Sequence, residues 1–571
     1  MYTASTAFLE ALTEAGVSYI FANLGSDHPA LIEALAEARI SGRKVPQLIT
    51  CPNEMVAMSA AHGYALVSGK AQAVLVHVEC GTQALAGAVH NAAKGRAPVL
   101  VFAGASPFTQ DGEMPGSRNE FIQWLQDVPD QRGIVRGYMK YDIEVRTGKN
   151  IKQLVHRAMQ FAHSDPKGPA YLMGAREVME EEIPCPARID ISEWTPIAHS
   201  ALPPEAVGQI IDALAQARRP LIVTSYVGRN CHAVDELVRF CERLGVGVLE
   251  SVPSAMNFPH DHPLYQGNQW SQPWQNPVLA KADVVLVLDS DVPWIPTVSR
   301  PGTNVLIFHI DVDPLKEKTP LWYIPAKRVY RADALTALKQ LNAALDASSP
   351  DAERAEARRK HYGELNTDRS AKLSGLEHPN GALPSAEFVT SCIRKHVDES
   401  TIALNEGITN YPIIFDHLRM SRPGSIFASG GGSLGWNGGA AIGAKLAAPE
   451  KTVMALTGDG SYMFSVPSTV HWMARQYSTP FLQVIYNNRG WKAPKFSTLA
   501  LHPDGYASRA NDIGVAFDPP PDYSAIAAAS GGAFARKVDR AEDVDGAIAE
   551  AIGIVREERR AAVLDVWLPH L

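Results

Sequence analysis

Thr-Val-Met-Ala-Leu-Thr-Gly-Asp-Gly-Ser, residues 452–461, reads as a buried strand that ends in a tight glycine turn. The near-continuous apolar run predicts a strand covered on both faces, as in a parallel sheet. The glycines let the backbone turn sharply, and the carboxylate between them, Asp459, can bind a hard cation through oxygen. A helical pattern follows over residues 467–476. Strand, turn and helix in this order predict an α/β fold.

The same alternation of short apolar runs and amphipathic helices extends over the whole chain. It predicts three consecutive α/β domains, each a doubly wound parallel sheet, over residues 1–180, 195–345 and 381–571. The charged stretch 346–380 should be an exposed helical linker. Open sheets of this kind bind ligands beyond the carboxyl ends of their strands, so we expect the chemistry on those loops.

The composition excludes several classes of protein. A net charge of −8 over 571 residues, without a long run of Lys or Arg, argues against nucleic-acid binding. No stretch reaches the roughly 20 apolar residues that span a bilayer, and the N-terminus lacks a signal-peptide pattern, so we expect a cytoplasmic protein without membrane contact. The six Cys residues form no C-x-x-C pair, which argues against a zinc site.

A second strand end completes a candidate metal site. Residues 481–485 lead into Asn487-Asn488-Arg489-Gly490, so an amide oxygen and a Gly carbonyl reach the same edge of the sheet as Asp459. An octahedral Mg²⁺, or Ca²⁺ in its place, could be bound by these groups and two phosphate oxygens. Each motif alone would read as an ordinary turn. Their joint spacing favours one site.

The two motifs resemble the signature of thiamine-diphosphate enzymes of the acetolactate synthase, pyruvate decarboxylase and benzoylformate decarboxylase type. The resemblance implies a last domain that binds the metal and the cofactor diphosphate through Asp459, Asn488, Gly490, Gly458, Gly460, Ser461 and Thr409. The interval from Asp459 to Asn488 is slightly longer than is usual in the family. We place the extra residues in the loop before the helix at 467–476.

The glycine-rich stretch 429–444 is similar to the family's G-G-x-L-G-[FW] motif. The resemblance assigns to Leu434 the wedge that bends the cofactor. It assigns to Gly432 the carbonyl that accepts a hydrogen bond from the aminopyrimidine.

In the first domain, Asn53-Glu54 opens a helical pattern that contains Gly63-Tyr64-Ala65. A Glu early in a helix is most often a solvated residue. Here Glu54 matches the family's catalytic glutamate, which makes this the pyrimidine-binding domain. Asn53 replaces the His that usually precedes that glutamate.

On the substrate side the chain most resembles benzoylformate decarboxylase. The resemblance makes Ser26 a candidate for holding a substrate carboxylate and His77 a candidate for relaying a proton. His28, on the same loop as Ser26, has no family counterpart and is equally open to a structural role. Gln126 is similar to a glutamine of acetolactate synthases, so the carboligase alternative stays open.

The resemblance implies that Glu54 protonates the cofactor's pyrimidine and that the activated thiazolium attacks a small 2-oxo acid, with loss of CO₂. Protonation of the resulting enamine releases an aldehyde, whereas transfer to an aldehyde or a second 2-oxo acid makes a hydroxyketone or acetohydroxy acid. A C–C lyase or hydrolase of the same superfamily is a further alternative. Residues 491–521 are expected to form a lid. The resemblance also implies a homodimer or homotetramer with active sites between subunits.

Other ligands fit the sequence less well. Val227-Gly228-Arg229 in the central domain lacks the glycine cluster of a flavin site, so we expect no FAD. Gly430-Gly431-Gly432 lacks the G-x-G-x-x-G spacing of a nicotinamide enzyme. A non-catalytic binding protein would not need Glu54 together with Leu434. Asp291 and Trp294 of the central domain remain unassigned.

Overall fold

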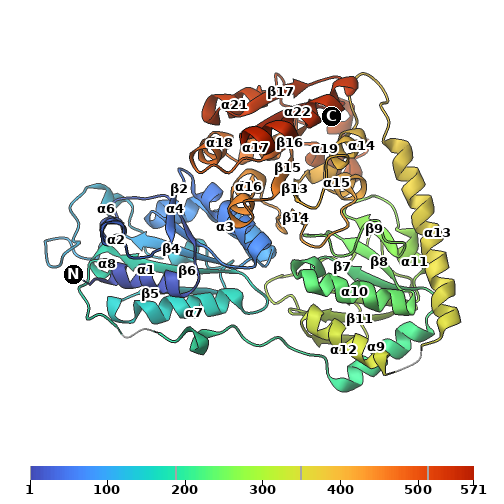
Figure 1. The fold of residues 1–571 in the computed structure, drawn as a ribbon, viewed down its shortest axis with the longest axis horizontal. Helices are drawn as coiled ribbons and strands as arrows, with labels where there is room; N and C mark the ends of the chain where they lie inside the picture. The colour runs from blue at the N-terminus through green and yellow to red at the C-terminus, as the bar shows by residue number, and fades with distance from the viewer. Residues whose placement is uncertain (1, 187–188, 348–349, 511–512, 571) are drawn as a thin grey trace.

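The computed structural model describes residues 2–186, 189–347, 350–510 and 513–570. These residues form three domains, each built on a six-stranded parallel sheet with helices on its faces (Figure 1). The α/β fold with three parallel sheets is thus confirmed. Residues 1 and 571 of the predicted first and last domains, and 348–349 of the predicted linker, lie outside the described residues.

The N-terminal sheet has the strand order β2-β1-β3-β4-β6-β5. Its strands are β1 (Tyr19–Ala22), β2 (Gln47–Thr50), β3 (Ala73–Val76), β4 (Val99–Ala105), β5 (Tyr141–Val145) and β6 (Pro169–Ala175). The helices around it are α1 (Ala4–Glu14), α2 (Pro29–Ser41), α3 (Glu54–Ser68), α4 (Val78–Ala84), α5 (Ala86–Lys94), α6 (Ile122–Leu125), α7 (Ile151–His163) and α8 (Arg176–Met179). Every residue of the inner strand β3 is buried, which explains its unbroken apolar sequence.

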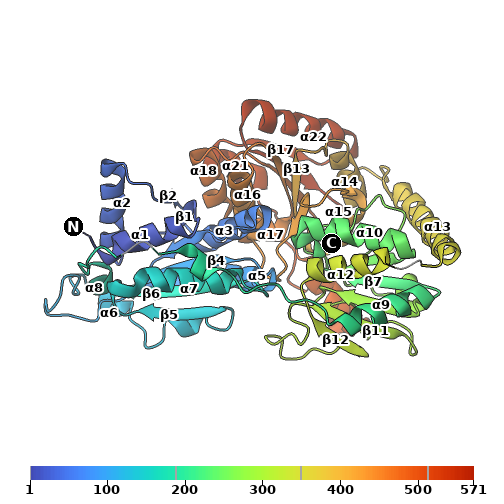
Figure 2. The ribbon, with the colours of Figure 1, turned by 60° about the horizontal axis from the view of Figure 1, so that its bottom comes forward.

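The central sheet has the order β12-β11-β10-β7-β8-β9. Its strands are β7 (Pro220–Thr224), β8 (Gly247–Ser251), β9 (Tyr265–Gln269), β10 (Val284–Leu288), β11 (Leu306–Asp311) and β12 (Arg328–Arg331), and its helices are α9 (Pro204–Gln216), α10 (Cys231–Leu244), α11 (Pro277–Lys281) and α12 (Ala334–Asp346). Helix α13 (Ala352–Leu376) runs along this domain at one side of the molecule (Figures 1 and 2). The sequence predicts an exposed helix here, but one side of α13 packs on the central domain. Its Tyr362 is buried and donates a hydrogen bond to the Pro220 carbonyl at 2.8 Å.

The C-terminal sheet has the order β14-β13-β15-β16-β18-β17, the same connectivity as the N-terminal sheet. Its strands are β13 (Thr401–Glu406), β14 (Ile426–Ala428), β15 (Thr452–Gly458), β16 (Leu482–Asn487), β17 (Phe534–Val538) and β18 (Ala562–Trp567). Its helices are α14 (Ala386–Arg394), α15 (Tyr411–Leu418), α16 (Trp436–Ala447), α17 (Asp459–Phe464), α18 (Pro467–Gln476), α19 (Lys492–Leu501), α20 (Tyr506–Ala510), α21 (Tyr523–Gly531) and α22 (Val544–Gly553). In both sheets the strand order reverses between the first and third strands, which opens a crevice at their carboxyl ends.

Helices α3 and α16 join the N-terminal domain to the C-terminal domain. Glycines let them pack backbone to backbone: a Cβ on Gly63 would lie 2.3 Å from the Ala440 carbonyl oxygen, and a Cβ on Gly443 would lie 1.8 Å from that of Ala60. Only glycine allows so close an approach. Apolar residues of both helices belong to one buried core cluster, so the two domains share a core.

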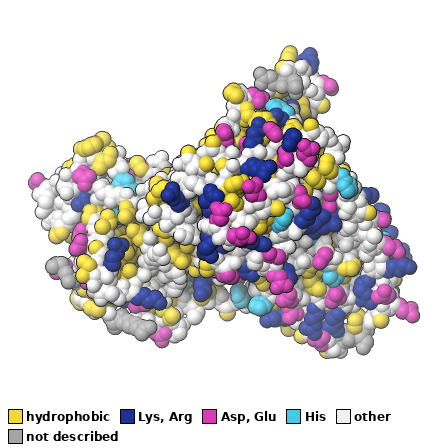
Figure 3. Space-filling view, turned by 45° about the horizontal axis from the view of Figure 1, so that its top comes forward, with side chains coloured by type: hydrophobic (Ala, Val, Ile, Leu, Met, Phe, Trp, Pro, Cys, Tyr) yellow, Lys and Arg dark blue, Asp and Glu magenta, His cyan; other side chains and the backbone are white. Residues whose placement is uncertain are grey.

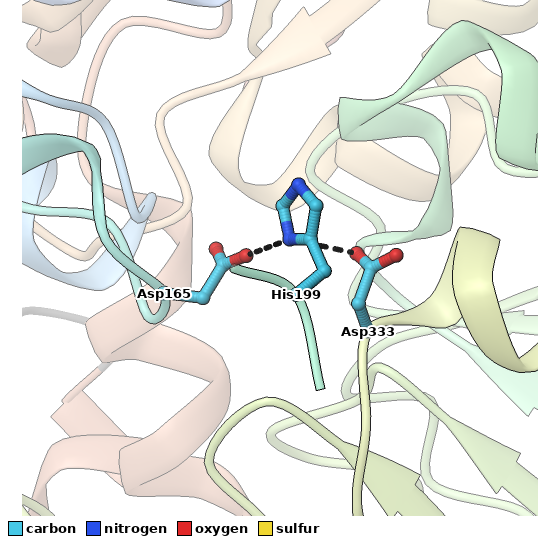
Figure 4. A group of neighbouring side chains, drawn as sticks. All are labelled: Asp165, His199 and Asp333. Atoms are coloured by element: carbon cyan, nitrogen blue, oxygen red, sulfur yellow. Dashed lines mark hydrogen bonds and ion pairs between the residues drawn. The ribbon is translucent and has the colours of Figure 1, made fainter. Parts of the chain in front are cut away.

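A polar contact fastens the connection between the first two domains. His199, on the segment before α9, has its Nδ1 atom 3.1 Å from Asp165 of the N-terminal domain and 3.8 Å from Asp333 at the start of α12 (Figure 4). The His199 side chain is 56% exposed, so this cluster is a contact between the two domains at the protein surface. No helix among the described residues is long and apolar enough to cross a membrane.

Candidate active site

A cavity of about 310 Å³ opens at the carboxyl ends of β13, β15 and β16, where the strand order reverses. It is lined by all nine residues that the sequence assigned to the cofactor and the metal: Thr409, Gly432, Leu434, Gly458, Asp459, Gly460, Ser461, Asn488 and Gly490. The cavity therefore unites motifs that are far apart in the sequence.

Asp459 begins α17 directly after β15 and is buried. Its Oδ1 accepts a hydrogen bond from the Gly460 N–H at 2.8 Å, and its Oδ2 accepts one from the Gly490 N–H at 2.9 Å. Burial raises the pKa of Asp459 to about 6. A divalent cation beside it would oppose that effect by stabilising the charged carboxylate.

Two more polar atoms in the cavity fit a metal–diphosphate ligand. Asn488 Oδ1 and Ser461 Oγ are buried without a hydrogen-bond partner in the described part of the chain. The neighbouring Asn487, by contrast, donates to Asp565 Oδ1 at 2.8 Å and accepts from the Arg489 N–H at 3.0 Å. An unpaired buried oxygen costs about 1–3 kcal/mol, which a bound cation would offset. The residues present therefore suit a hard cation held by Asp459 and Asn488.

The sequence interpretation missed the residue that positions the glycine-rich loop. Glu406 ends β13, and its buried carboxylate accepts the N–H groups that open α16, from Gly435 at 2.7 Å, Trp436 at 3.2 Å and Asn437 at 2.8 Å. Burial raises its pKa to about 7. A Glu at a strand end, ahead of a glycine-rich helix start, was the available signal.

Asn91 of the N-terminal domain holds the same loop from the other side. Its Nδ2 donates to the Ser433 carbonyl at 2.8 Å, and its Oδ1 accepts from the Ser433 N–H at 3.0 Å. The neighbouring Gly432 donates its N–H to His90 Nε2 at 3.0 Å. The loop that carries Leu434 is thus fixed by two domains.

Glu54 is the first residue of α3, beyond the end of β2. The preceding Asn53 caps this helix, because its side chain accepts the Val56 N–H at 3.1 Å. The Asn that departs from the family pattern therefore has a structural role. The half-buried Glu54 carboxylate lies close to Gly81, where a Cβ would be 3.3 Å from its Oε1.

His77 follows β3 and is paired with a carboxylate that the sequence interpretation also missed. Its Nδ1 lies 2.5 Å from Asp27 Oδ1, and the other Asp27 oxygen accepts the Val78 N–H at 3.0 Å. Its Nε2 lies 3.1 Å from Gln126 Oε1. The hydrogen bond to Asp27 raises the pKa of His77. Acceptors on both ring nitrogens favour the protonated imidazole, so His77 can act as a proton donor.

Two glycines make room for this pair. A Cβ on Gly25 would lie 2.0 Å from His77 Nδ1, and a Cβ on Gly104 would lie 1.7 Å from Asp27 Oδ2. His28 is buried beside them, and its Nδ1 accepts the Gly25 N–H at 3.0 Å. Burial lowers the pKa of His28, which favours its neutral form and a role in holding the loop. The half-buried Ser26 hydroxyl has no hydrogen-bond partner among the described residues.

Within one chain, the strand that leads into Glu54 lies beside the segment before β16, whereas Asn488 follows the end of β16. Thr50, four residues before Glu54, donates its N–H to Tyr477 Oη at 2.6 Å, and β2 accordingly lies beside α18 (Figure 1). Tyr477 precedes the start of β16, whose far end leads into Asn488. At about 3.3 Å per residue, this strand separates the two ends by roughly 20 Å.

Asp291, which has no assigned role in the sequence analysis, takes part in a contact between the N-terminal and central domains. Arg96 of the N-terminal domain lies over the Tyr226 ring of the central domain and pairs with Asp291 at 2.6 Å and Asp311 at 3.0 Å. Lys316 pairs with the same two carboxylates at 2.7 and 2.6 Å. Although burial opposes it, Arg96 holds the pKa of Asp311 well below its usual range. Trp294 is buried in the adjacent core.

Three family models match the chain in order. They are the N-terminal TPP binding domain of thiamine pyrophosphate enzymes over residues 2–134, the central domain over 207–341 and the C-terminal TPP binding domain over 407–566. Thiamine pyrophosphate is the same compound as thiamine diphosphate.

Individual relatives cover almost the whole chain. A sulfoacetaldehyde acetyltransferase from Castellaniella defragrans is 25% identical over 99% of this chain and 93% of that protein. A benzoylformate decarboxylase from Pseudomonas aeruginosa is 24% identical over 97% of this chain and 98% of that protein. The crystal structure of benzoylformate decarboxylase from Polynucleobacter necessarius shares the fold, with a TM-score of 0.79, 18% identity and coverage of 100% and 99%. The chain belongs to the thiamine pyrophosphate enzyme family.

Proposed function

We propose that this protein is a thiamine-diphosphate- and Mg²⁺-dependent decarboxylase of a small 2-oxo acid. The observation that carries the decarboxylase assignment is the pairing of His77 with Asp27 at 2.5 Å. When CO₂ leaves a 2-oxo acid, a proton must take its place before an aldehyde can be released. A histidine at the carboxyl edge of β3 whose pKa is raised by its carboxylate partner suits that step.

The proposed cofactor site uses the residues of the 310 Å³ cavity. Asp459, Asn488 and the Gly490 carbonyl would hold Mg²⁺, and the turns at residues 458–461 and at Thr409 would hold the diphosphate. Leu434 would support the bent cofactor, with the Gly432 carbonyl on its aminopyrimidine. Thiamine diphosphate, once bound, would supply an electron sink for the bonding electron pair that stays behind when CO₂ leaves.

The remaining steps use side chains of the N-terminal domain. Glu54 would hold a proton at the cofactor's pyrimidine nitrogen. The Ser26 hydroxyl, which has no partner among the described residues, would donate to the substrate carboxylate. His77 would then deliver the proton from Nε2, and Asp27 would keep the ring oriented and charged through Nδ1. His28 would hold the loop that carries Ser26.

One contact favours carboligation as a second candidate activity. Gln126 Oε1 lies 3.1 Å from His77 Nε2 and so competes for the proton that releases an aldehyde. A slower proton delivery gives an acceptor aldehyde or a second 2-oxo acid more time to react. Among the relatives, the sulfoacetaldehyde acetyltransferase is named as a transferase.

We further propose that two chains complete each active site, in a homodimer or homotetramer. Thr50, before Glu54, contacts Tyr477 ahead of β16, and β16 extends for roughly 20 Å before Asn488, which supports a partner chain as the source of the Glu54 carboxylate. Large apolar side chains are exposed near both groups of residues: Trp124 at 47% and Leu125 at 73% next to Gln126, and Phe464 at 47% and Trp491 at 37% at the cavity. Figure 3 shows charged side chains gathered on the lobe with the central domain, at the right, and fewer of them on the N-terminal lobe, at the left.

The start of the segment 491–521 lies at the cavity, where a lid would be placed. Trp491 and the first three residues of α19, Lys492, Ala493 and Pro494, line the cavity. Residues 511–512 of the segment lie outside the described residues. Closing over the cavity would exclude water from the reacting atoms.

The test is an assay of the purified protein with thiamine diphosphate, Mg²⁺ and a panel of 2-oxo acids headed by benzoylformate and pyruvate. Released CO₂ and the products are followed with and without an acceptor aldehyde. We expect CO₂ from at least one acid, the corresponding aldehyde without the acceptor, and a hydroxyketone with it. Absence of CO₂ from the whole panel would contradict the proposal and favour a C–C lyase or hydrolase.

A further inference from the structure

A second and larger cavity, of about 530 Å³, lies between the N-terminal and central domains. Its walls come from the end of α5, the segments 137–140 and 157–169, and the loop 313–319 after β11. It shares no lining residue with the 310 Å³ cavity. It is therefore a separate compartment whose chemistry can be considered independently.

The lining of this cavity is basic in an acidic protein. Eight Lys or Arg residues and four Asp or Glu residues line it, whereas the whole chain has a net charge of −8. A concave surface with the opposite sign to the rest of the molecule concentrates anions.

Salt bridges neutralise only part of this charge. Arg96 and Lys316 are paired with Asp291 and Asp311, and Arg331 is paired with Glu317 at 2.5 Å. In the described part of the chain, no carboxylate lies within ion-pair distance of the ammonium groups of Lys94, Lys140 and Lys318. These three lysines therefore belong to the uncompensated part of the lining.

The three lysines belong to different segments but affect one another. Lys140 donates to the Ser164 carbonyl and Lys318 donates to the Met139 carbonyl, so their fixed partners are neutral oxygens. Burial and, to a smaller extent, the charge of Lys318 lower the pKa of Lys140 to about 8, although Asp165 opposes them. Desolvation and, to a smaller extent, the charge of Lys94 likewise lower the pKa of Lys318, although Asp142 opposes them. An anion placed between these ammonium groups would relieve their repulsion.

Other residues of the lining offer an apolar surface. Tyr138, Phe161, Pro166 and Pro169 line it, and the Phe161 ring is stacked on Tyr141 at 4.9 Å between centroids. Arg157 lies over the Phe161 ring at 5.1 Å. The volume falls within the range of small-molecule sites, and the mixture of an apolar wall with a few convergent cations is typical of them.

We propose that this cavity binds a small organic phosphate with at least two negative charges, with its phosphates on Lys94, Lys140 and Lys318 and its organic part against Tyr138 and Phe161. Lysine ammonium groups bind phosphate as point charges and impose little geometry. A bound phosphate would bridge the N-terminal and central domains beside the Arg96 contact. This inference does not depend on the reaction proposed above.

The test is calorimetric titration of the protein saturated with thiamine diphosphate and Mg²⁺, so that the other cavity is not available to the probe. The probes are pyrophosphate, adenosine diphosphate and fructose 1,6-bisphosphate, with adenosine as the uncharged control. We expect saturable binding of at least one phosphate, an affinity that falls as salt rises, and a dissociation constant at least tenfold weaker in Lys94→Met and in Lys140→Met.

The controls separate charge from folding. Lys94 has no ion pair among the described residues, so Lys94→Met removes charge without leaving a side-chain partner unpaired. Lys140→Arg keeps the charge and should keep the affinity within a few-fold. Lys360→Met, on the exposed face of α13, removes the same charge away from the cavity and should change nothing. No binding of any phosphate at millimolar concentration, equal binding by both cavity variants and the parent protein, or binding of adenosine as tight as its diphosphate would overturn the proposal.

Discussion

Asp27 Oδ1 lies 2.5 Å from His77 Nδ1, and the second Asp27 oxygen accepts the N–H of Val78, the residue after His77. One carboxylate therefore fixes both the ring and the backbone beside it. Neither contact involves residues that are close in the sequence, since Asp27 follows β1 and His77 follows β3. In the proposed reaction, Asp27 controls the protonation of His77, the side chain that delivers the proton for aldehyde release.

Replacing that carboxylate tests its effect on His77. In the parent protein the hydrogen bond to Asp27 raises the pKa of His77, so the donor form is present at low pH and is lost as pH rises through that raised pKa. Asp27→Asn should lower the pKa, move the decline in aldehyde release to lower pH, and slow release about 10²-fold at neutral pH. The pH profile of kcat measures this. Asp130→Asn, at an exposed acid, should leave the profile unchanged, and an identical profile for Asp27→Asn would refute the role given to the pair.

Gly25→Ala tests the space beside the same ring. The added Cβ would lie 2.0 Å from His77 Nδ1, so His77 must move and its contact with Asp27 must lengthen. We expect kcat to fall by about tenfold or more with cofactor binding retained. Gly208→Ala is the matched control, because a Cβ there meets nothing within 4 Å in α9, and it should stabilise the protein by roughly 0.5–1 kcal/mol. Full activity of Gly25→Ala would show that the position of His77 is not needed.

The titration of Asp459 predicts how the metal stabilises the protein. Burial raises its pKa to about 6 in the metal-free chain, above the value of an unfolded Asp. The stability that this group contributes is therefore present at low pH and is lost as pH rises through about 6. Mg²⁺ needs the ionised carboxylate, so the rise in melting temperature on adding Mg²⁺ and thiamine diphosphate should be larger at pH 7.5 than at pH 5.5. In Asp459→Asn this rise in melting temperature should depend little on pH. An equal rise at both pH values in the parent protein would argue against Asp459 as a ligand.

Glu54→Gln tests the proposed proton carrier of the pyrimidine. The substitution keeps the size of the side chain, so the cofactor should still bind, while turnover should fall by at least about 10²-fold. Calorimetric titration with thiamine diphosphate and a steady-state assay give the two readouts. Glu33→Gln, at an exposed position of α2, is the control and should behave as the parent protein. Turnover that is unchanged in Glu54→Gln would exclude Glu54 from the chemistry.

Much of the fold followed from local pattern. Buried strands such as β15 and β16 have unbroken apolar sequences because both of their faces are covered, and glycine turns mark where they end. The residues around Asp459 and Asn488 could be grouped because parallel strands bring their carboxyl ends to one edge.

The residues that were missed have no local signal of comparable strength. Asp27 and Glu406 read as single acidic residues, and their importance appears only when His77 and the start of α16 are brought against them. The role of Asp291 likewise could not be predicted, because its partner Arg96 belongs to another domain. The shared core of α3 and α16 depends on glycines whose partners are hundreds of residues away, which no periodicity reveals.

The central claim is that Glu54 of one chain and Asp459 of another serve one cofactor. It is tested most directly by mixing two inactive variants, Glu54→Gln and Asp459→Asn, after separate purification with different affinity tags, and by isolating the doubly tagged oligomer. We predict that this hybrid recovers roughly half of the parent activity per dimer, because one of its two sites receives both intact residues. A doubly tagged hybrid as inactive as its two parent variants would contradict the claim.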